Sequence, residues 1–141
     1  MSLILSIETA TTNCSVSLSK AGKTIVLKED YDHNYSHAER LHIYISAVLK
    51  EAKISKNDID AVAVSMGPGS YTGLRIGVSA AKGLCFALDK PLIAIPTLES
   101  VAHQVKINNG VIISMLDARR MEVYSAIYDS NYKQIRETQA H

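Results

Sequence analysis

The stretch Gly67-Pro-Gly-Ser-Tyr-Thr-Gly-Leu-Arg-Ile-Gly77 joins an apolar run, residues 60–66, to a segment of helix length at residues 71–88. The run is apolar enough for a central strand, and the loop that follows it is compact. A glycine-rich turn from strand to helix can direct backbone N–H groups at an anion. The loop matches neither G-x-x-x-x-G-K-[ST] nor G-x-G-x-x-G, so by itself it indicates phosphate binding only weakly. The stretch therefore predicts a strand–loop–helix unit within an α/β fold.

Outward from this unit, the neighbouring patterns predict the element order βββαβαβα. The first three strands have short connections and favour an antiparallel meander. Ser36-His37-Ala38-Glu39 has the S-x-x-E form of a capping box and predicts the start of a helix. The predicted strands are 3–9, 14–19, 24–28, 60–66 and 91–95, and the predicted helices are 36–53, 71–88 and 97–105. This order is typical of a mixed sheet flanked by helices, as in ribonuclease-H-like folds.

The pattern of the first strands restarts after Gly110. Residues 112–117 repeat the pattern of residues 3–8, and the next alternating positions correspond at the same offset: Met121, Val123 and Ile127 to Thr12, Cys14 and Leu18. Two successive strands at one offset indicate a duplicated lobe, with a third strand at 133–137. We therefore expect a first lobe over 1–108 and the beginning of a second, truncated lobe over 109–141.

Composition narrows the class of protein. Fifteen Lys and Arg against fourteen Asp and Glu leave a net charge of +1, which excludes a strongly basic surface for holding nucleic acid. No apolar run approaches the roughly 18–20 residues that span a bilayer. Cys14 and Cys85 lie in apolar patterns, so we expect buried free thiols in a reducing cytoplasm.

Small residues recur along the predicted helix 71–88. Gly73, Gly77 and Ala81 are spaced every four residues, although each glycine inside a helix costs about 1 kcal/mol relative to alanine. Such a face suits two backbones that meet closely, either between two chains or against the protein's own first helix, and spacing alone does not decide. The candidate partner interface comprises Gly69, Ser70, Tyr71, Thr72, Gly73, Arg75, Gly77 and Ala81.

The first hairpin turn is a second candidate site. In duplicated actin-like ATPase folds this turn carries an Asp, a Gly and hydroxyl residues near Mg²⁺ and phosphate. Here Glu8 is longer than Asp, and Ala10 places a Cβ where close backbone approach favours Gly. Either a working ATP site or a polar hairpin inherited from one fits the residues. We interpret Glu8, Thr9, Thr11 and Thr12 as a degenerate nucleotide turn.

Histidines and acidic residues give no metal or catalytic prediction. His37 and His42 are five residues apart, a poor helical pair for one ion, and His33 precedes the helix. The charged segment 117–122 is interpreted as a solvent-exposed turn.

Several motifs together resemble the bacterial TsaB (YeaZ) family of tRNA threonylcarbamoyladenosine biosynthesis proteins. These are Ile7-Glu-Thr-Ala-Thr11, Cys14-Ser-Val-Ser-Leu18, the 67–77 stretch, Lys82-Gly-Leu84, Pro96-Thr-Leu98 and Asp117-Ala-Arg-Arg-Met-Glu-Val-Tyr124. The resemblance implies a duplicated actin-like (ASKHA) fold. It also implies a non-catalytic subunit that binds and supports the transferase TsaD together with TsaE, without catalytic residues, metal or cofactor of its own.

The same resemblance has further consequences for partners. It implies a heterodimer with TsaD, contact with tRNA only through the complex, and ATP or ADP at most at a shared interface. The small-residue face of the helix 71–88 predicts in addition a homodimer when the chain is alone, through the helices that begin near Ser36 and Tyr71. Thr97 and Val101 stand where TsaD carries its metal-binding histidines. Two alternatives remain open at this stage: a nucleotide-binding ASKHA enzyme of kinase-like or glycoprotease-like type, and a self-associating scaffold.

Overall fold

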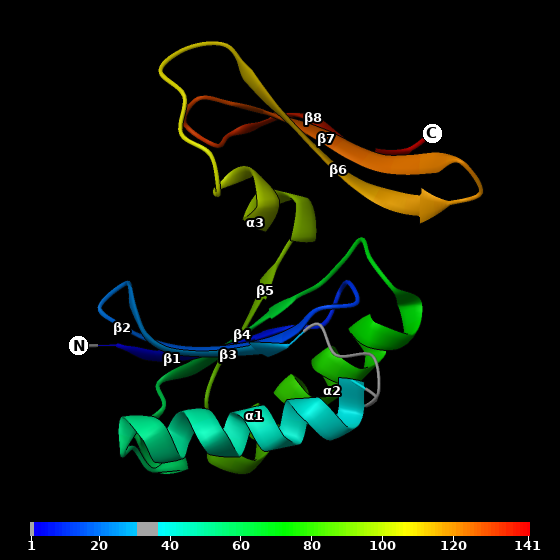
Figure 1. Cartoon of the computed structure of the whole chain (residues 1–141). Helices are drawn as coiled ribbons and strands as arrows, with labels where there is room; N and C mark the ends of the chain where they lie inside the picture. Colours follow the sequence, from blue (N-terminus) through cyan, green and yellow to red (C-terminus); the bar gives the residue numbers. More distant parts are fainter. Residues whose placement is uncertain (1, 31–36) are drawn as a thin grey trace.

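The computed structural model describes residues 2–30 and 37–141 and contains two sheets (Figure 1). In chain order its elements are β1 Leu3–Glu8, β2 Cys14–Lys20, β3 Lys23–Asp30, α1 His37–Ala52, the 3₁₀ turn η1 Lys56–Asp58, β4 Ala61–Ser65, α2 Tyr71–Leu88, β5 Leu92–Ile95, α3 Thr97–Ala102, β6 Val111–Arg119, β7 Glu122–Asp129 and β8 Gln134–Ala140. The predicted order βββαβαβα is confirmed, and three further strands follow it.

The first sheet is mixed, with the strand order β3-β2-β1-β4-β5. β1, β2 and β3 form the predicted antiparallel meander, whereas β4 pairs in parallel with both β1 and β5. Helices α1 and α2 lie side by side on one face of this sheet (Figure 1). This is the mixed sheet flanked by helices that the sequence predicts.

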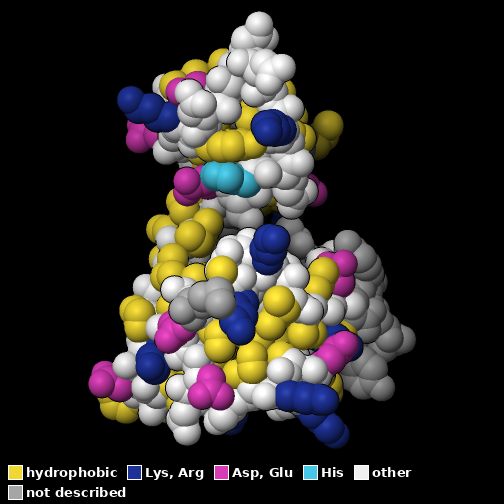
Figure 2. Space-filling model, turned by 90° about the vertical axis from the view of Figure 1, so that its left-hand side faces the viewer, with side chains coloured by type: hydrophobic (Ala, Val, Ile, Leu, Met, Phe, Trp, Pro, Cys, Tyr) yellow, Lys and Arg dark blue, Asp and Glu magenta, His cyan; other side chains and the backbone are white. Residues whose placement is uncertain are grey.

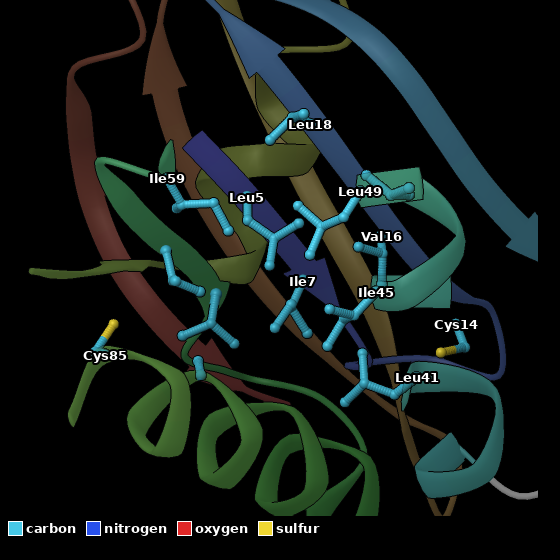
Figure 3. Close-up of a cluster of buried hydrophobic side chains, with 14 residues drawn as sticks. Leu5, Ile7, Cys14, Val16, Leu18, Leu41, Ile45, Leu49, Ile59 and Cys85 are labelled. Carbon is cyan, nitrogen blue, oxygen red and sulfur yellow. The ribbon is translucent and has the colours of Figure 1, made fainter. Parts of the chain in front are cut away.

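Alternating side chains of the strands form the core beneath the two helices. Leu5, Val16 and Leu18 are fully buried, and α1 adds Leu41 and Val48, also fully buried (Figure 3). Burying one such side chain contributes about 1.5–3 kcal/mol. Cys14 and Cys85 are free and buried, as predicted, at different places in the same core.

The helix ends follow local rules. Ser70 is the N-cap of α2, because its Oγ accepts a hydrogen bond of 3.2 Å from the amide of Gly73. α1 ends at Ala52, close to the predicted end, and Lys53 follows in a left-handed conformation with φ of 57°. The capping box predicted at Ser36 lies outside the described residues.

The second sheet is an antiparallel meander with the order β6-β7-β8. α3 packs on one of its faces, where Leu98 and Ala102 join a core with Ile112, Ala126 and Tyr128. α3 was expected within the first lobe, and it ends at Ala102 rather than near residue 105. Its packing partners are β6 and β7, because its buried side chains face the second sheet.

The remaining surface carries both exposed apolar side chains and charged side chains of either sign. On the other face of β6, Val111, Ile113 and Met115 are 52%, 56% and 57% exposed. Figure 2 shows Lys and Arg side chains interspersed with Asp and Glu on the face that it displays, in keeping with the net charge of +1. Among the helices of the described residues, none has the length and apolar character needed to cross a bilayer.

Candidate functional site

The first hairpin turn and the start of α2 meet in one pocket between the two sheets. This pocket has a volume of about 540 Å³. Its lining comes from the β1–β2 turn, the start of α1, the loop and first turn of α2, and β6 with β7: Ala10, Thr11, Thr12, His37, Gly69, Ser70, Tyr71, Thr72, Leu116, Asp117, Ala118, Arg119 and Tyr124. The structure therefore brings together residues that the sequence predicted as two separate sites.

Close backbone contact joins the loop before α2 to the hairpin turn. The amide of Ser70 donates a hydrogen bond of 2.7 Å to the carbonyl of Ala10. A Cβ added at Gly69 would lie 2.7 Å from both the Cβ and the carbonyl oxygen of Ala10, closer than real Cβ atoms approach. Glycine at position 69 is therefore required by this approach.

The carboxylate of Glu8 accepts hydrogen bonds from Ser65 and from the turn that follows it. Its Oε1 accepts a hydrogen bond of 2.7 Å from Ser65 Oγ, and its Oε2 accepts one of 3.0 Å from the amide of Ala10. The side chain of Ala10 is itself buried. Both carboxylate oxygens and one amide of the turn are thus engaged by hydrogen bonds within the protein.

Two carbonyl groups of the same turn are held by α1. His37 Nε2 lies 2.7 Å from the carbonyl oxygen of Thr11, a contact that places the proton on Nε2, and Arg40 Nη2 donates to the carbonyl of Thr12 at 3.4 Å. The side chains of Thr11 and Thr12 are exposed and line the pocket. Only these two of the four predicted turn residues therefore face the pocket.

The small face of α2 is internal. Thr9 is 1% exposed and its Oγ1 donates a hydrogen bond of 2.6 Å to the carbonyl of Gly73. A Cβ at Gly73 would overlap the carbonyl oxygen of Thr9, and a Cβ at Gly77 would overlap Thr9 Oγ1. Ala81 is fully buried in the first core.

The prediction that Gly73, Gly77 and Ala81 contact a partner is therefore wrong, because the lobe buries them itself. The alternative, packing against the protein's own first helix, is wrong for Gly73 and Gly77 as well. Both glycines lie against Thr9, at the end of β1, and Gly77 also approaches Ile7.

The exposed side of α2 faces a groove of which the sequence predicted only Thr72 and Arg75. Tyr71 is 74% exposed, and the guanidinium of Arg75 lies over its ring, 5.4 Å from the centroid. The groove between α1 and α2 has a volume of about 850 Å³ and is lined by His42, Ile45, Thr72, Arg75, Ile76, Ser79, Ala80 and Leu84, among others. Thr72 lines both the groove and the pocket between the sheets. On α2, Thr72, Ile76, Ser79 and Gly83 form a row of lining residues beside the buried small face.

Thr97 ties the loop to α3 from the other side. Its amide donates to the carbonyl of Gly67 at 2.9 Å, and its Oγ1 accepts from the amide of Gly67 at 3.2 Å. The side chain is 1% exposed. Thr97 therefore positions the loop, and Val101, four residues later, offers no metal ligand.

Metal-binding clusters and reactive thiols were sought among the residues that the structure describes. Within residues 2–30 and 37–141, no three His, Cys, Asp or Glu side chains lie close enough to hold a metal ion; His33 lies outside these residues. Burial raises the pKa of the Cys14 thiol, against a smaller lowering by Arg40, and burial also raises the pKa of Cys85. Both thiols are therefore protonated at neutral pH.

Comparisons with known proteins agree with this architecture. A family model described as TsaD, tRNA N6-adenosine threonylcarbamoyltransferase, matches residues 32–141. The tRNA threonylcarbamoyladenosine biosynthesis protein TsaB of Escherichia coli (strain K12) is 37% identical over 127 residues, which cover 89% of this chain and 54% of the relative. The protein of the same name from Bacillus subtilis (strain 168) is 34% identical over 125 residues, again 89% and 54%.

A solved structure titled YeaZ from Pseudomonas aeruginosa superposes with a TM-score of 0.85 at 30% identity. The match covers 100% of this chain and 67% of that chain. The chain spans about half the length of the curated relatives it matches. On the family model, the identities and the superposition, the chain belongs to the TsaD family of actin-like proteins, in its TsaB (YeaZ) group.

Proposed function

We propose that this chain acts in tRNA threonylcarbamoyladenosine biosynthesis in the cytoplasm as a non-catalytic subunit, which binds and supports TsaD together with TsaE. The names of the relatives support the process. The non-catalytic role is supported above all by one observation: both oxygens of Glu8 are engaged by Ser65 and by the backbone of the turn. Glu8 is also not among the residues that line the pocket between the two sheets.

The groove between α1 and α2 is the surface that we assign to the partner. It combines apolar side chains such as Ile76 and Leu84 with the exposed Tyr71–Arg75 pair at its end. Exposed aromatic and Arg side chains beside an apolar groove are typical of protein interfaces. Of the predicted interface residues, Thr72 and Arg75 line this groove and Tyr71 stands beside it.

The same groove serves a homodimer when the chain is alone, so TsaD and a second copy compete for it. Contact with tRNA runs through the complex, in keeping with the net charge of +1. The chain carries no cofactor of its own, and ATP or ADP binds only at an interface shared with a partner.

Titration with TsaD tests this function. Ser79 is exposed and lines the groove, so Ser79→Arg places a long charged side chain in the interface without touching the core. We expect at least a tenfold weaker affinity for TsaD and a loss of homodimer in light scattering. The matched control is Ser100→Arg, on the exposed side of α3, which leaves both unchanged.

Two results would overturn the proposal. Turnover of ATP by the purified chain, abolished by Glu8→Gln, would favour a kinase-like enzyme instead. Self-association that TsaD neither displaces nor weakens would favour a scaffold unrelated to the transferase.

A further inference from the structure

The turn between β6 and β7 has an unusual backbone for its sequence. Arg119 pairs with Glu122, so Arg120 and Met121 form a two-residue hairpin loop. The φ angles of Arg119, Arg120 and Met121 are 67°, 54° and 61°, all in the left-handed region. Positive φ at both loop residues is the backbone of a type I′ turn, which favours Asn-Gly because side chains with a normal Cβ are strained there.

Large side chains occupy this strained turn and extend into solvent. Met121 is fully exposed, and Arg119 and Arg120 are also exposed. The Oδ1 of Asp117 accepts a hydrogen bond of 2.8 Å from the amide of Arg119, which fixes the start of the turn. Residues held in a costly conformation while their side chains make no core contact point to a role for those side chains.

The turn stands beside the surface assigned to the partner. Arg119 and Tyr71 line the same pocket, and Thr72 continues from that pocket into the α1–α2 groove. Figure 1 shows the β6–β7 turn on the side of the molecule where α2 begins. Arg120 and Met121 directly follow Arg119, which lines the pocket that Thr72 connects to the groove.

We propose that Arg119, Arg120 and Met121 form a second contact for the protein partner of the α1–α2 groove, on an acidic surface of that partner with an apolar recess for Met121. This inference rests on the proposed function, because the partner is the same TsaD. The two guanidinium groups suit carboxylates or phosphates. The exposed thioether favours a protein over an RNA backbone, since a phosphate offers nothing for Met121 to pack against.

The test replaces the tip by the sequence that its backbone prefers. In the double variant Arg120→Asn, Met121→Gly the strain disappears, so we expect the melting temperature to rise by roughly 5 °C. The affinity for TsaD falls roughly tenfold in the same variant, and its salt dependence becomes weaker because one cationic contact is lost. Higher stability with weaker binding is a combination that a merely structural turn does not produce.

The β2–β3 turn provides a matched control. Ala21 and Gly22 form its two-residue loop with φ of 52° and 80°, between Lys20 and Lys23. Ala21→Asn therefore creates the same Asn-Gly turn elsewhere on the chain, and it should raise stability while leaving the affinity for TsaD unchanged.

The outcomes separate the inference from the proposed function. Wild-type affinity in the double variant, with Ser79→Arg still impaired, overturns the inference alone. Impaired binding in the double variant with normal binding by Ser79→Arg supports the tip and overturns the groove, and a wild-type chain that does not bind TsaD overturns both. Unchanged TsaD affinity with weaker tRNA binding by the complex would assign the tip to RNA and overturn the protein contact.

Discussion

Alanine at position 77 is the sharpest probe of how α2 packs. In an exposed helix, Gly→Ala stabilises by about 1 kcal/mol. Here the new Cβ overlaps Thr9 Oγ1 in a fully packed region, and such overpacking costs about 1–3 kcal/mol. Moving the hydroxyl also breaks its 2.6 Å hydrogen bond to the carbonyl of Gly73. Leaving that buried hydroxyl without a partner costs about 1–3 kcal/mol more.

Together these contributions predict that Gly77→Ala loses about 1–5 kcal/mol in the free energy of unfolding. At roughly 3–4 °C per kcal/mol for a chain of this length, the melting temperature should fall by roughly 3–20 °C. Urea denaturation with circular dichroism measures the free energy directly, and an unchanged m-value would show that the unfolded state is unaffected.

Gly83→Ala is the matched control within the same helix. No atom lies within 4 Å of a Cβ built at Gly83, which is exposed, so this variant should gain up to about 1 kcal/mol. In a Thr9→Ala background the clash is absent, and Gly77→Ala should cost less than in the wild type. Equal stability of Gly77→Ala and Gly83→Ala would refute the packing of Gly77 against Thr9.

Two further predictions follow from buried groups. Thr97→Val leaves the amide of Gly67 without its side-chain acceptor, so we expect a loss of about 1–3 kcal/mol and faster hydrogen exchange at Gly67, both restored by Thr97→Ser. Burial raises the pKa of Cys14 and Cys85 above the ordinary 9.0, and burial with the nearby Glu99 raises that of Tyr128 above 10.0. The stability that these three groups contribute is complete at a pH below their ordinary pKa values, and it is lost as the pH rises through their pKa values in the folded protein. The urea midpoint should therefore be lower at pH 10.5 than at pH 8. Cys14→Ala should reduce this difference.

Most of the fold could be predicted from the sequence, because the patterns that specify its elements are local. Strand alternation and the length of the 71–88 segment each depend on residues close together in the chain, and both are present. The boundaries of α3 were not readable, since its apolar side chains face β6 and β7 rather than the sheet that precedes it.

Only part of the candidate site could be predicted from the sequence. The spacing of Gly73 and Gly77 correctly indicates a close backbone approach, but it carries no information about which segment approaches. That segment is Thr9, which lies 64 residues before Gly73. Beyond Thr72 and Arg75, the lining of the groove was not predicted, because it alternates polar and apolar residues from two helices. Neither helix alone shows a pattern that differs from an ordinary surface.

The central position of β1 decides the order in which the chain can fold during synthesis. Ile4 pairs with Ser19 of β2 on one side and with Ala61 of β4 on the other. Although β1 is synthesised first, its second edge therefore stays unpaired until β4 has been synthesised. The sheet is complete once β5 ends at Ile95, and none of its strands comes from later residues. Because domains fold as units and N-terminal ones first, the first core can close before β6 is made. A substitution such as Gly77→Ala therefore acts on the earlier event on the ribosome, whereas a change at Tyr128 acts on the later one.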